Sequence, residues 1–287
     1  MGGTIEWVEA GGHRLRMRRS PKPGAPVLLL TNAWPQTIRC WDRQWDRLAR
    51  RHELLAVDLP GFGLSSGTRE VMRPSAQAAV LAALLERLGT APPVMIAPDV
   101  GVPIALALAD RHPGAVGSLV LFDGPADYPP DVGWEARLLY RSAVARRAMS
   151  LLGVPFTLET IRRGYRTKAL RPSRAAVAEY IRAAASPRRF GLTLHYLGSY
   201  ARELPRSGGW PGVDVPVLVT WGSEDAFLAP SNGERLAETL PHATWRPLAG
   251  VGHYAHEDAG ERFLDLLDEW IAASFPSPDA AALAERE

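Results

Sequence analysis

Cysteine is almost absent from this chain of 287 residues, in which Cys40 is the only one. A single cysteine excludes an intramolecular disulfide and is typical of proteins kept in a reducing compartment. Long apolar runs are also missing, since none reaches the about 20 residues that a membrane-spanning helix needs. The N-terminal residues lack the charged and apolar regions of a secretory signal. These absences predict a cytoplasmic protein.

A charge excess of either sign is missing as well. The 33 basic and 31 acidic side chains leave a formal net charge of +2, and the arginines are scattered among acidic and apolar residues. This balance gives no reason to expect nucleic acid or a membrane as a partner. What is present is a hydrophobic share of 46 %, which is ordinary for a globular protein. The length suits one large α/β domain with an insertion, or two domains.

Strand-like and helix-like segments alternate along much of the chain. Apolar runs with the composition of buried strands occur at residues 25–31, 53–59, 93–96, 117–122, 215–220 and 244–247. Segments with helical spacing occur at residues 40–51, 75–88 and 261–275. The alternating pattern at residues 4–20 adds a hairpin at a sheet edge. Together these segments predict a parallel sheet that helices cover on both faces.

The strand pattern is missing between residues 125 and 210. A proline-rich linker opens this stretch, helix-like segments fill it, and the glycine-rich residues 207–212 close it. A helical insertion between two strands is typical of a lid over the strand ends, where open α/β sheets bind ligands. We therefore predict a core made of residues 1–124 and 211–287 and a helical cap made of residues 125–210.

The segment at residues 93–108 combines a strand, a small-x-Asp-x-small pentapeptide and an Ala/Leu-rich helix. Asp99 is the central residue, and Ala97 and Gly101 flank it. Strand, sharp turn and helix are the context of a nucleophile elbow, whose central side chain is exposed above the sheet. The helix N-terminus favours an ionised carboxylate there, which can attack carbon directly. Taken alone, Asp99 is equally well explained as a helix N-cap.

Two polar residues follow strands farther along the chain. Asp225 comes shortly after the strand at 215–220, and His253 follows the strand at 244–247. Because the carboxyl ends of parallel strands meet at one edge of a sheet, we expect both near Asp99. The order nucleophile, acid, base is that of α/β-hydrolases. Singly, Asp225 could be a turn residue and His253 a solvated loop residue.

Nearly the whole chain resembles the α/β-hydrolase fold superfamily, and an aspartate nucleophile under a helical lid is similar to its epoxide hydrolase and haloalkane dehalogenase branch. Residues 57–65 (VDLPGFGLS) and 252–257 (GHYAHE) resemble two loops of this superfamily. The resemblance implies a mostly parallel, eight-stranded type of sheet and no metal or cofactor. It also implies that Asp99 attacks an sp3 carbon. His253, oriented by Asp225, would then activate water to hydrolyse the ester.

The leaving group distinguishes the members of this branch. Dehalogenases that resemble this chain place Trp directly after the nucleophile, or Arg in the fluoroacetate type, whereas this chain has Val100. An aliphatic residue there is tolerated among epoxide hydrolases. The resemblance assigns the oxyanion hole to the backbone N–H groups of Trp34 and Val100. Asp123 is a reserve candidate for the acid, since some related dehalogenases take it from that loop.

Epoxide hydrolases of this kind protonate the leaving alkoxide with lid tyrosines. The cap has five: Tyr140, Tyr165, Tyr180, Tyr196 and Tyr200. By position we predict Tyr140 and Tyr196 as the acids. Tyr200 is predicted as a substrate-binding residue and is a close rival of Tyr196. Each of these tyrosines could also be a packing residue.

Two departures from the family pattern bear on the substrate. Asn32-Ala33-Trp34-Pro35 replaces the usual His-Gly-x-Pro, and Ala97-Pro98 replaces Gly-His before the nucleophile. Trp34 is predicted to bind substrate, and its indole could also supply a halide-binding N–H. The sequence thus favours an epoxide hydrolase, with a small hydrophobic substrate and water as its partners, in a monomer or homodimer. The alternatives are a haloalkane dehalogenase, or a binding protein or epoxide-opening cyclase without ester turnover.

Overall fold

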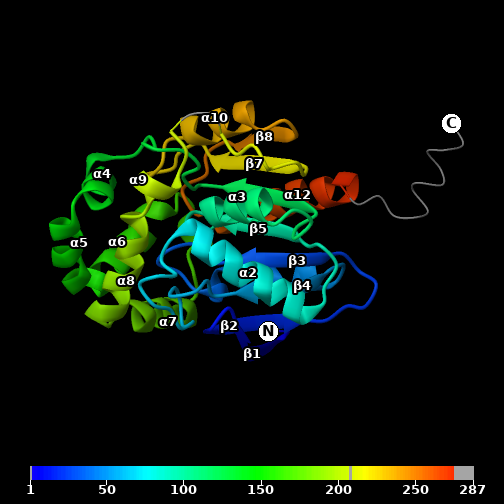
Figure 1. Ribbon diagram of the computed structural model, residues 1–287, viewed down its shortest axis with the longest axis horizontal. Helices are drawn as coiled ribbons and strands as arrows, with labels where there is room; N and C mark the ends of the chain where they lie inside the picture. Colours follow the sequence, from blue (N-terminus) through cyan, green and yellow to red (C-terminus); the bar gives the residue numbers. More distant parts are fainter. Residues whose placement is uncertain (1, 207–208, 275–287) are drawn as a thin grey trace, which may run out of the picture.

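A single eight-stranded sheet runs through the computed structural model, which describes residues 2–206 and 209–274. The strands are β1 (Thr4–Ala10), β2 (His13–Ser20), β3 (Val27–Thr31), β4 (Glu53–Val57), β5 (Val94–Pro98), β6 (Ser118–Phe122), β7 (Val217–Gly222) and β8 (Ala243–Leu248). Their order across the sheet is β1-β2-β4-β3-β5-β6-β7-β8 (Figure 1). The first two strands form an antiparallel hairpin and β2 pairs antiparallel with β4, while every other pairing is parallel. The predicted mostly parallel sheet with a hairpin at its edge is confirmed.

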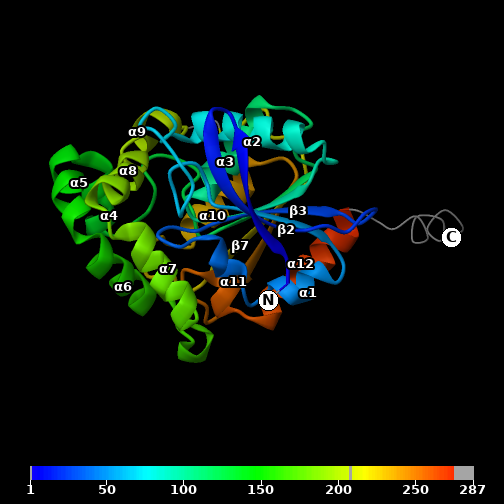
Figure 2. The same cartoon turned by 90° about the horizontal axis from the view of Figure 1, so that it is seen from below.

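Helices cover both faces of this sheet. Those of the core are α1 (Trp45–Ala49), α2 (Pro74–Leu88), α3 (Gly101–Arg111), α10 (Ser231–Thr239), α11 (Ala255–Asp258), α12 (Glu261–Ser274) and the 3-10 turn η1 (Ile38–Trp41). Figure 2 shows α2 and α3 on one side of the sheet and α1 and α12 on the other. Two apolar layers therefore enclose the strands.

The alternation of side chains along β5 explains why both faces need a cover. Met95 and Ala97 belong to the apolar cluster beneath α2 and α3. Val94 and Ile96 belong to the cluster beneath α1 and α12. Successive strand residues point to opposite faces, so a strand that is apolar throughout is stable only when both faces are buried.

One predicted helix is interrupted. The segment at 40–51 splits into η1 and α1, and a turn between them brings Asp42 against Arg18 of β2, with 2.8 Å between Oδ1 and Nη1. Trp41 and Trp45 are both buried, so the turn lets each indole reach the core. The helix α10 was not predicted at all. Residues 1, 207–208 and 275–287, which the predicted core, cap and closing helix include, lie outside the described residues.

The cap helices lie between β6 and β7 and project to one side of the core (Figure 1). They are α4 (Trp134–Arg141), α5 (Ala143–Met149), α6 (Gly153–Gly164), α7 (Arg174–Ala184), α8 (Pro187–Leu197), α9 (Tyr200–Glu203) and the 3-10 turns η2 (Ser150–Leu152) and η3 (Lys168–Leu170). An ion pair ties the cap to the core, because Glu179 of α7 accepts two bonds from Arg16 of β2, at 2.6 and 3.1 Å. Within residues 2–206 and 209–274, no helix has the length and apolar character needed to cross a bilayer.

Candidate active site

Asp99 lies in a sharp turn between β5 and α3. Its φ of 47° is in the left-handed region that non-glycine residues rarely adopt. Close packing surrounds the turn: a Cβ on Gly124 would collide with the main-chain oxygen of Asp99, and one on Gly101 would collide with the Thr31 hydroxyl. The small residue at 101 thus reflects the close approach of α3 to β3. The turn lifts the Asp99 carboxylate above the edge of the sheet.

The carboxylate of Asp99 does not act as a helix cap. Val100 occupies the N-cap position of α3 and makes no side-chain capping bond. The Asp99 Oδ2 atom instead accepts a hydrogen bond of 2.8 Å from the backbone N–H of Trp34, on the loop after β3. Asn32 anchors that loop, because its Oδ1 accepts from the N–H of Leu59 at 2.8 Å. An amide from another strand end therefore faces the aspartate.

His253 pairs with Asp225 at the same edge of the sheet. The distance from His253 Nδ1 to Asp225 Oδ2 is 2.9 Å, and the other carboxylate oxygen of Asp225 accepts from the N–H groups of Phe227 and Leu228 at 2.8 and 3.1 Å. Both side chains are almost fully buried. Asp225 is thus held in place, and it orients the imidazole.

Asp123, the reserve candidate for the acid, is used differently. Its φ of 54° places it in a second left-handed turn at the end of β6. Its two carboxylate oxygens accept from the N–H of Gly222 at 3.1 Å and of Ala255 at 2.9 Å. Burial and the charge of Asp225 raise its pKa. Asp123 therefore joins the loop that carries Asp225 to the loop that carries His253, while Asp225 contacts the imidazole.

The charges of the three groups are coupled. Burial raises the pKa of Asp99 to about 6, although His253 and the amides of Trp34 and Val100 oppose this rise. Burial would lower the pKa of His253, but Asp225, Asp99 and Asp123 outweigh it and raise the pKa to about 9. At neutral pH, Asp99 is ionised and His253 is protonated. The resting site thus contains an anionic carboxylate and an imidazolium.

A cavity of about 430 Å³ lies between these residues and the cap. Asp99 and His253 line its floor. Its walls are largely apolar and include Trp34, Leu139, Met149, Phe156, Leu197 and Phe227. A cavity of this size and lining suits a small hydrophobic molecule. The lining residues that were not predicted include Phe156, Phe227 and Tyr254. Of these three, only Tyr254 could have been found from the sequence, because it directly follows the predicted site residue His253.

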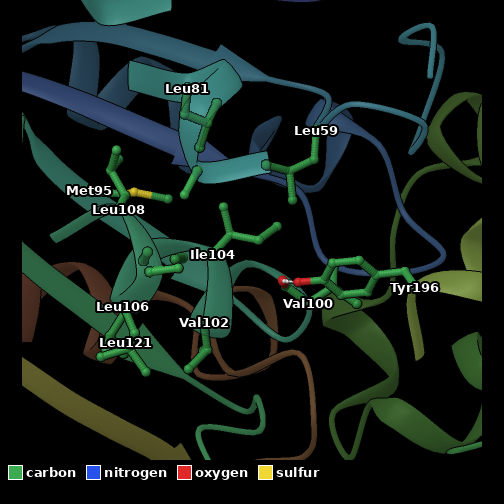
Figure 3. Close-up of a cluster of buried hydrophobic side chains, with 14 of the residues drawn as sticks. Leu59, Leu81, Met95, Val100, Val102, Ile104, Leu106, Leu108, Leu121 and Tyr196 are labelled. Carbon is green, nitrogen blue, oxygen red and sulfur yellow. Dashed lines mark hydrogen bonds between the residues drawn. The ribbon is translucent and has the colours of Figure 1, made fainter. Parts of the chain in front are cut away.

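The cap tyrosines separate into two groups. Tyr140 and Tyr200 line the cavity, and their ring centroids are 5.3 Å apart. Tyr196 does not line it: its hydroxyl donates to the backbone oxygen of Val100 at 2.9 Å (Figure 3). Tyr165 donates to Glu257 at 2.6 Å, and the buried Tyr180 packs beside it. The expectation that Tyr196 faces the cavity is therefore wrong, whereas its rival Tyr200 lines the cavity beside Tyr140.

The indole of Trp34 contacts residues of the cap. Its Nε1 donates to the hydroxyl of Thr193 at 2.9 Å, and the ring stacks on Phe190 and contacts Phe156. Trp34 therefore lines the cavity with its apolar face. Its N–H, considered above as a halide-binding group, is already paired. Within the described ranges, no cluster of His, Cys, Asp and Glu has the arrangement of a metal site.

Comparison with known proteins agrees with this architecture. The family model described as alpha/beta hydrolase fold matches residues 26–260. A 2-hydroxy-6-oxononadienedioate/2-hydroxy-6-oxononatrienedioate hydrolase of Burkholderia vietnamiensis is 26% identical, over 77% of this chain and 76% of its own. The haloalkane dehalogenase DbeA of Bradyrhizobium elkani USDA94 has a TM-score of 0.76 and 26% identity, covering 94% of this chain and 98% of its own. Cfl2 of Burkholderia cenocepacia has a TM-score of 0.80 at 22% identity, covering 93% and 95% of the two chains, and shares the fold. The chain belongs to the α/β-hydrolase fold family.

Proposed function

We propose that the protein hydrolyses a small hydrophobic epoxide to a diol through a covalent ester on Asp99. The observation that carries this proposal is the pairing of an ionised carboxylate with two phenols across one apolar cavity. Burial raises the pKa of Tyr140 and of Tyr200, so both hydroxyls keep their protons at neutral pH. For Tyr140 the charge of Asp99 adds to this effect. Protonated phenols are the donors that an opening epoxide oxygen requires.

The first step forms a bond between Asp99 and substrate carbon. Oδ2 of Asp99 is bound to the Trp34 amide, so in the proposed step Oδ1 attacks the ring carbon. The carbon–oxygen bond of the epoxide breaks, and its electron pair remains on the departing oxygen. A phenol proton from Tyr140 or Tyr200 neutralises that alkoxide. The product of this step is a hydroxyalkyl ester of Asp99.

The second step returns Asp99 to its free form. The imidazolium first returns its proton to the phenolate left by ring opening, which makes His253 neutral. Neutral His253 then takes a proton from water, and the resulting hydroxide adds to the carbonyl carbon of the ester. Negative charge then develops on Oδ2, to which the Trp34 amide donates in the resting site, and the Val100 amide also stabilises the charge of this side chain. Collapse of this intermediate breaks the bond to the alkyl oxygen. That oxygen takes the proton of the newly formed carboxyl group, so the diol is released and Asp99 is again a carboxylate beside a protonated His253.

Haloalkane dehalogenation is the second candidate, favoured by the 26% identity to DbeA over 94% of this chain. A departing halide needs N–H donors beside the nucleophile. Val100 has no side-chain donor, and the indole N–H of Trp34 is bound to Thr193. The donors that the cavity offers are the hydroxyls of Tyr140 and Tyr200, which suit an alkoxide better than a halide. A binding protein or cyclase on this fold would keep the cavity but would not turn over an ester.

Isotope labelling distinguishes these functions. In a single turnover in ¹⁸O-water, the ester route places the label in the Asp99 carboxyl group and leaves the first diol unlabelled. Label enters the diol only on later turnovers. We expect this pattern with an aromatic or aliphatic epoxide, measured by mass spectrometry of the Asp99 peptide and of the product. Label in the first diol would contradict the ester, and halide release without diol formation would favour dehalogenation.

Replacement of Tyr200 by Phe is expected to slow ring opening about 10²- to 10⁴-fold, because one proton donor is lost, and to leave ester hydrolysis nearly unchanged. Tyr140→Phe tests the second donor in the same way. Tyr196→Phe is the matched control: it removes the bond to the Val100 oxygen, which costs about 1 kcal/mol of stability. Stopped-flow and quenched single-turnover measurements separate the two steps. A greater loss of ring opening in Tyr196→Phe than in Tyr200→Phe would restore Tyr196 as the acid.

The two steps should also differ in their dependence on pH. Ester formation needs ionised Asp99, so its rate rises as the pH passes about 6 and then levels off. Ester hydrolysis needs neutral His253, so its rate rises toward the pKa of His253. Esterification removes the charge of Asp99 and brings that pKa below about 9. The ester should therefore accumulate most at about pH 7, between the two pKa values. Intact-mass measurements on quenched samples check this, and identical profiles for both steps would contradict it.

A further inference from the structure

The charge of this protein is distributed very unevenly. Residues 134–206, which span the cap helices, contain 15 Lys and Arg residues against four Asp and Glu residues. The remaining residues contain 18 basic and 27 acidic side chains. The formal net charge of +2 is therefore the balance of a strongly basic cap and an acidic core. A local excess of this size attracts anionic partners, whatever the charge of the whole chain.

The cap also exposes large apolar side chains. Trp134 is 72% exposed, Val144 80% and Leu151 72%. Leu138, Leu152 and Leu158 are about half exposed. All six lie on α4, α5, η2 and α6, and the helices α4 and α5 lie at the end of the cap farthest from the sheet in both views (Figures 1 and 2). We call this set of six side chains the apolar face of the cap. In the described residues, the other large apolar side chains with comparable exposure are Ile5 and Trp7 at the sheet edge.

Three members of the apolar face also line the active-site cavity. Trp134, Leu138 and Leu152 each contact the cavity while exposing about half or more of their surface to solvent. The exposed lining residues Gly133, Glu135 and Ala148 lie on the same part of the cap, so the open side of the cavity faces in this direction. The mouth of the cavity therefore lies on the apolar face, among side chains that would meet any partner docked there.

We propose that the apolar face of the cap docks on an anionic lipid bilayer, so that apolar substrate enters the cavity directly from the membrane. Exposed arginines stand among the apolar side chains, including Arg137 and Arg141 on α4 and Arg147 on α5. The acidic side chains of α4–α6 are Glu135 and Glu159. Apolar side chains that enter the acyl boundary, flanked by arginines that meet lipid phosphates, are the combination that holds a protein at such an interface.

A bilayer fits these observations better than a protein partner. The apolar side chains are spread over four short elements, with charged residues between them, and do not form one continuous strip. A fluid bilayer accommodates scattered insertions, whereas a folded partner needs shape complementarity. The cavity mouth adds a second reason, because a hydrophobic substrate concentrates in the bilayer, directly opposite the opening.

Flotation of the full chain with lipid vesicles tests the proposal. We expect the protein to float with vesicles of phosphatidylcholine and phosphatidylglycerol, to remain free with phosphatidylcholine alone, and to dissociate as salt is raised. The variant R141Q/R147Q should bind about 25-fold more weakly, since each arginine near an anionic surface contributes about fivefold. The variant V144S/L151S should lose binding on the order of tenfold or more. None of these four residues lines the cavity.

The matched control removes the same charge from the core. Arg87 and Arg111 are exposed near the ends of α2 and α3, and R87Q/R111Q should bind vesicles like the unchanged protein. Thermal unfolding of each variant checks that the fold is intact. Equal binding to neutral vesicles, equal losses in the core and cap variants, or no flotation at all would overturn the proposal. Light scattering that showed a dimer abolished by V144S/L151S would also overturn it and assign the face to a second copy of the chain.

Discussion

Replacing Asp99 with Ala should reduce turnover on the order of 10⁴- to 10⁶-fold, because the substitution removes the only atom that bonds to substrate carbon in the proposed mechanism. The remaining cavity would still bind the substrate, since its walls are formed by other residues. Diol formation measured over hours, together with substrate binding by calorimetry, checks both parts of this expectation.

Asp99→Asn is the control for shape. The amide keeps the size of the side chain and keeps an oxygen for the Trp34 N–H, but it has no anionic oxygen to attack with. We expect it to be as inactive as Asp99→Ala and to unfold at a temperature close to that of the unchanged protein. Turnover in either variant within about tenfold of the unchanged protein would show that the reaction does not use a covalent ester.

Replacement of His253 by Gln should stop the reaction after its first step. Asp99 can still attack, but no base remains to activate water, so ester hydrolysis slows about 10²- to 10⁴-fold. The intact protein should therefore gain the mass of one substrate molecule. The loss of the imidazolium also removes a charge that lowers the pKa of Asp99. That pKa then rises above about 6, so the experiment is best done at about pH 8, where Asp99 is ionised.

Two variants give this trapping experiment its controls. His195→Gln alters a cap histidine that does not line the cavity and should give no adduct. Asp225→Asn keeps the imidazole but removes the carboxylate 2.9 Å from its Nδ1, so the adduct should form and decay at an intermediate rate. An absence of adduct in His253→Gln, with an active first step in the unchanged protein, would contradict the assignment of His253 as the base of the second step.

The elbow and its two partners were predictable because each follows a buried strand directly. A parallel sheet brings the carboxyl ends of its strands to one edge, so Asp99, Asp225 and His253 had to emerge near one another once the strands were recognised. Their roles remain predictions, which the variants above test. The helix α10 was missed because its sequence, residues 231–239, begins with polar residues and a glycine.

The lid acid was not predictable from position in the chain. Tyr196 and Tyr200 are four residues apart, a spacing that places two side chains on one face of a continuous helix. The two rings do lie side by side, with their centroids 5.3 Å apart. The spacing does not show where each side chain ends: the Tyr196 hydroxyl is bound to the Val100 oxygen, whereas Tyr200 lines the cavity.

By itself, the sequence determined the fold, the strained turn at Asp99 and the order of the candidate triad, because these depend on local patterns and on the topology of a parallel sheet. Only the tertiary structure decided the partner of the Trp34 indole, which is Thr193, 159 residues away. It likewise decided which tyrosines face the carboxylate and where the basic and apolar side chains of the cap gather. Those features arise from the packing of helices against one another, and helix packing depends on contacts between residues that no local pattern relates.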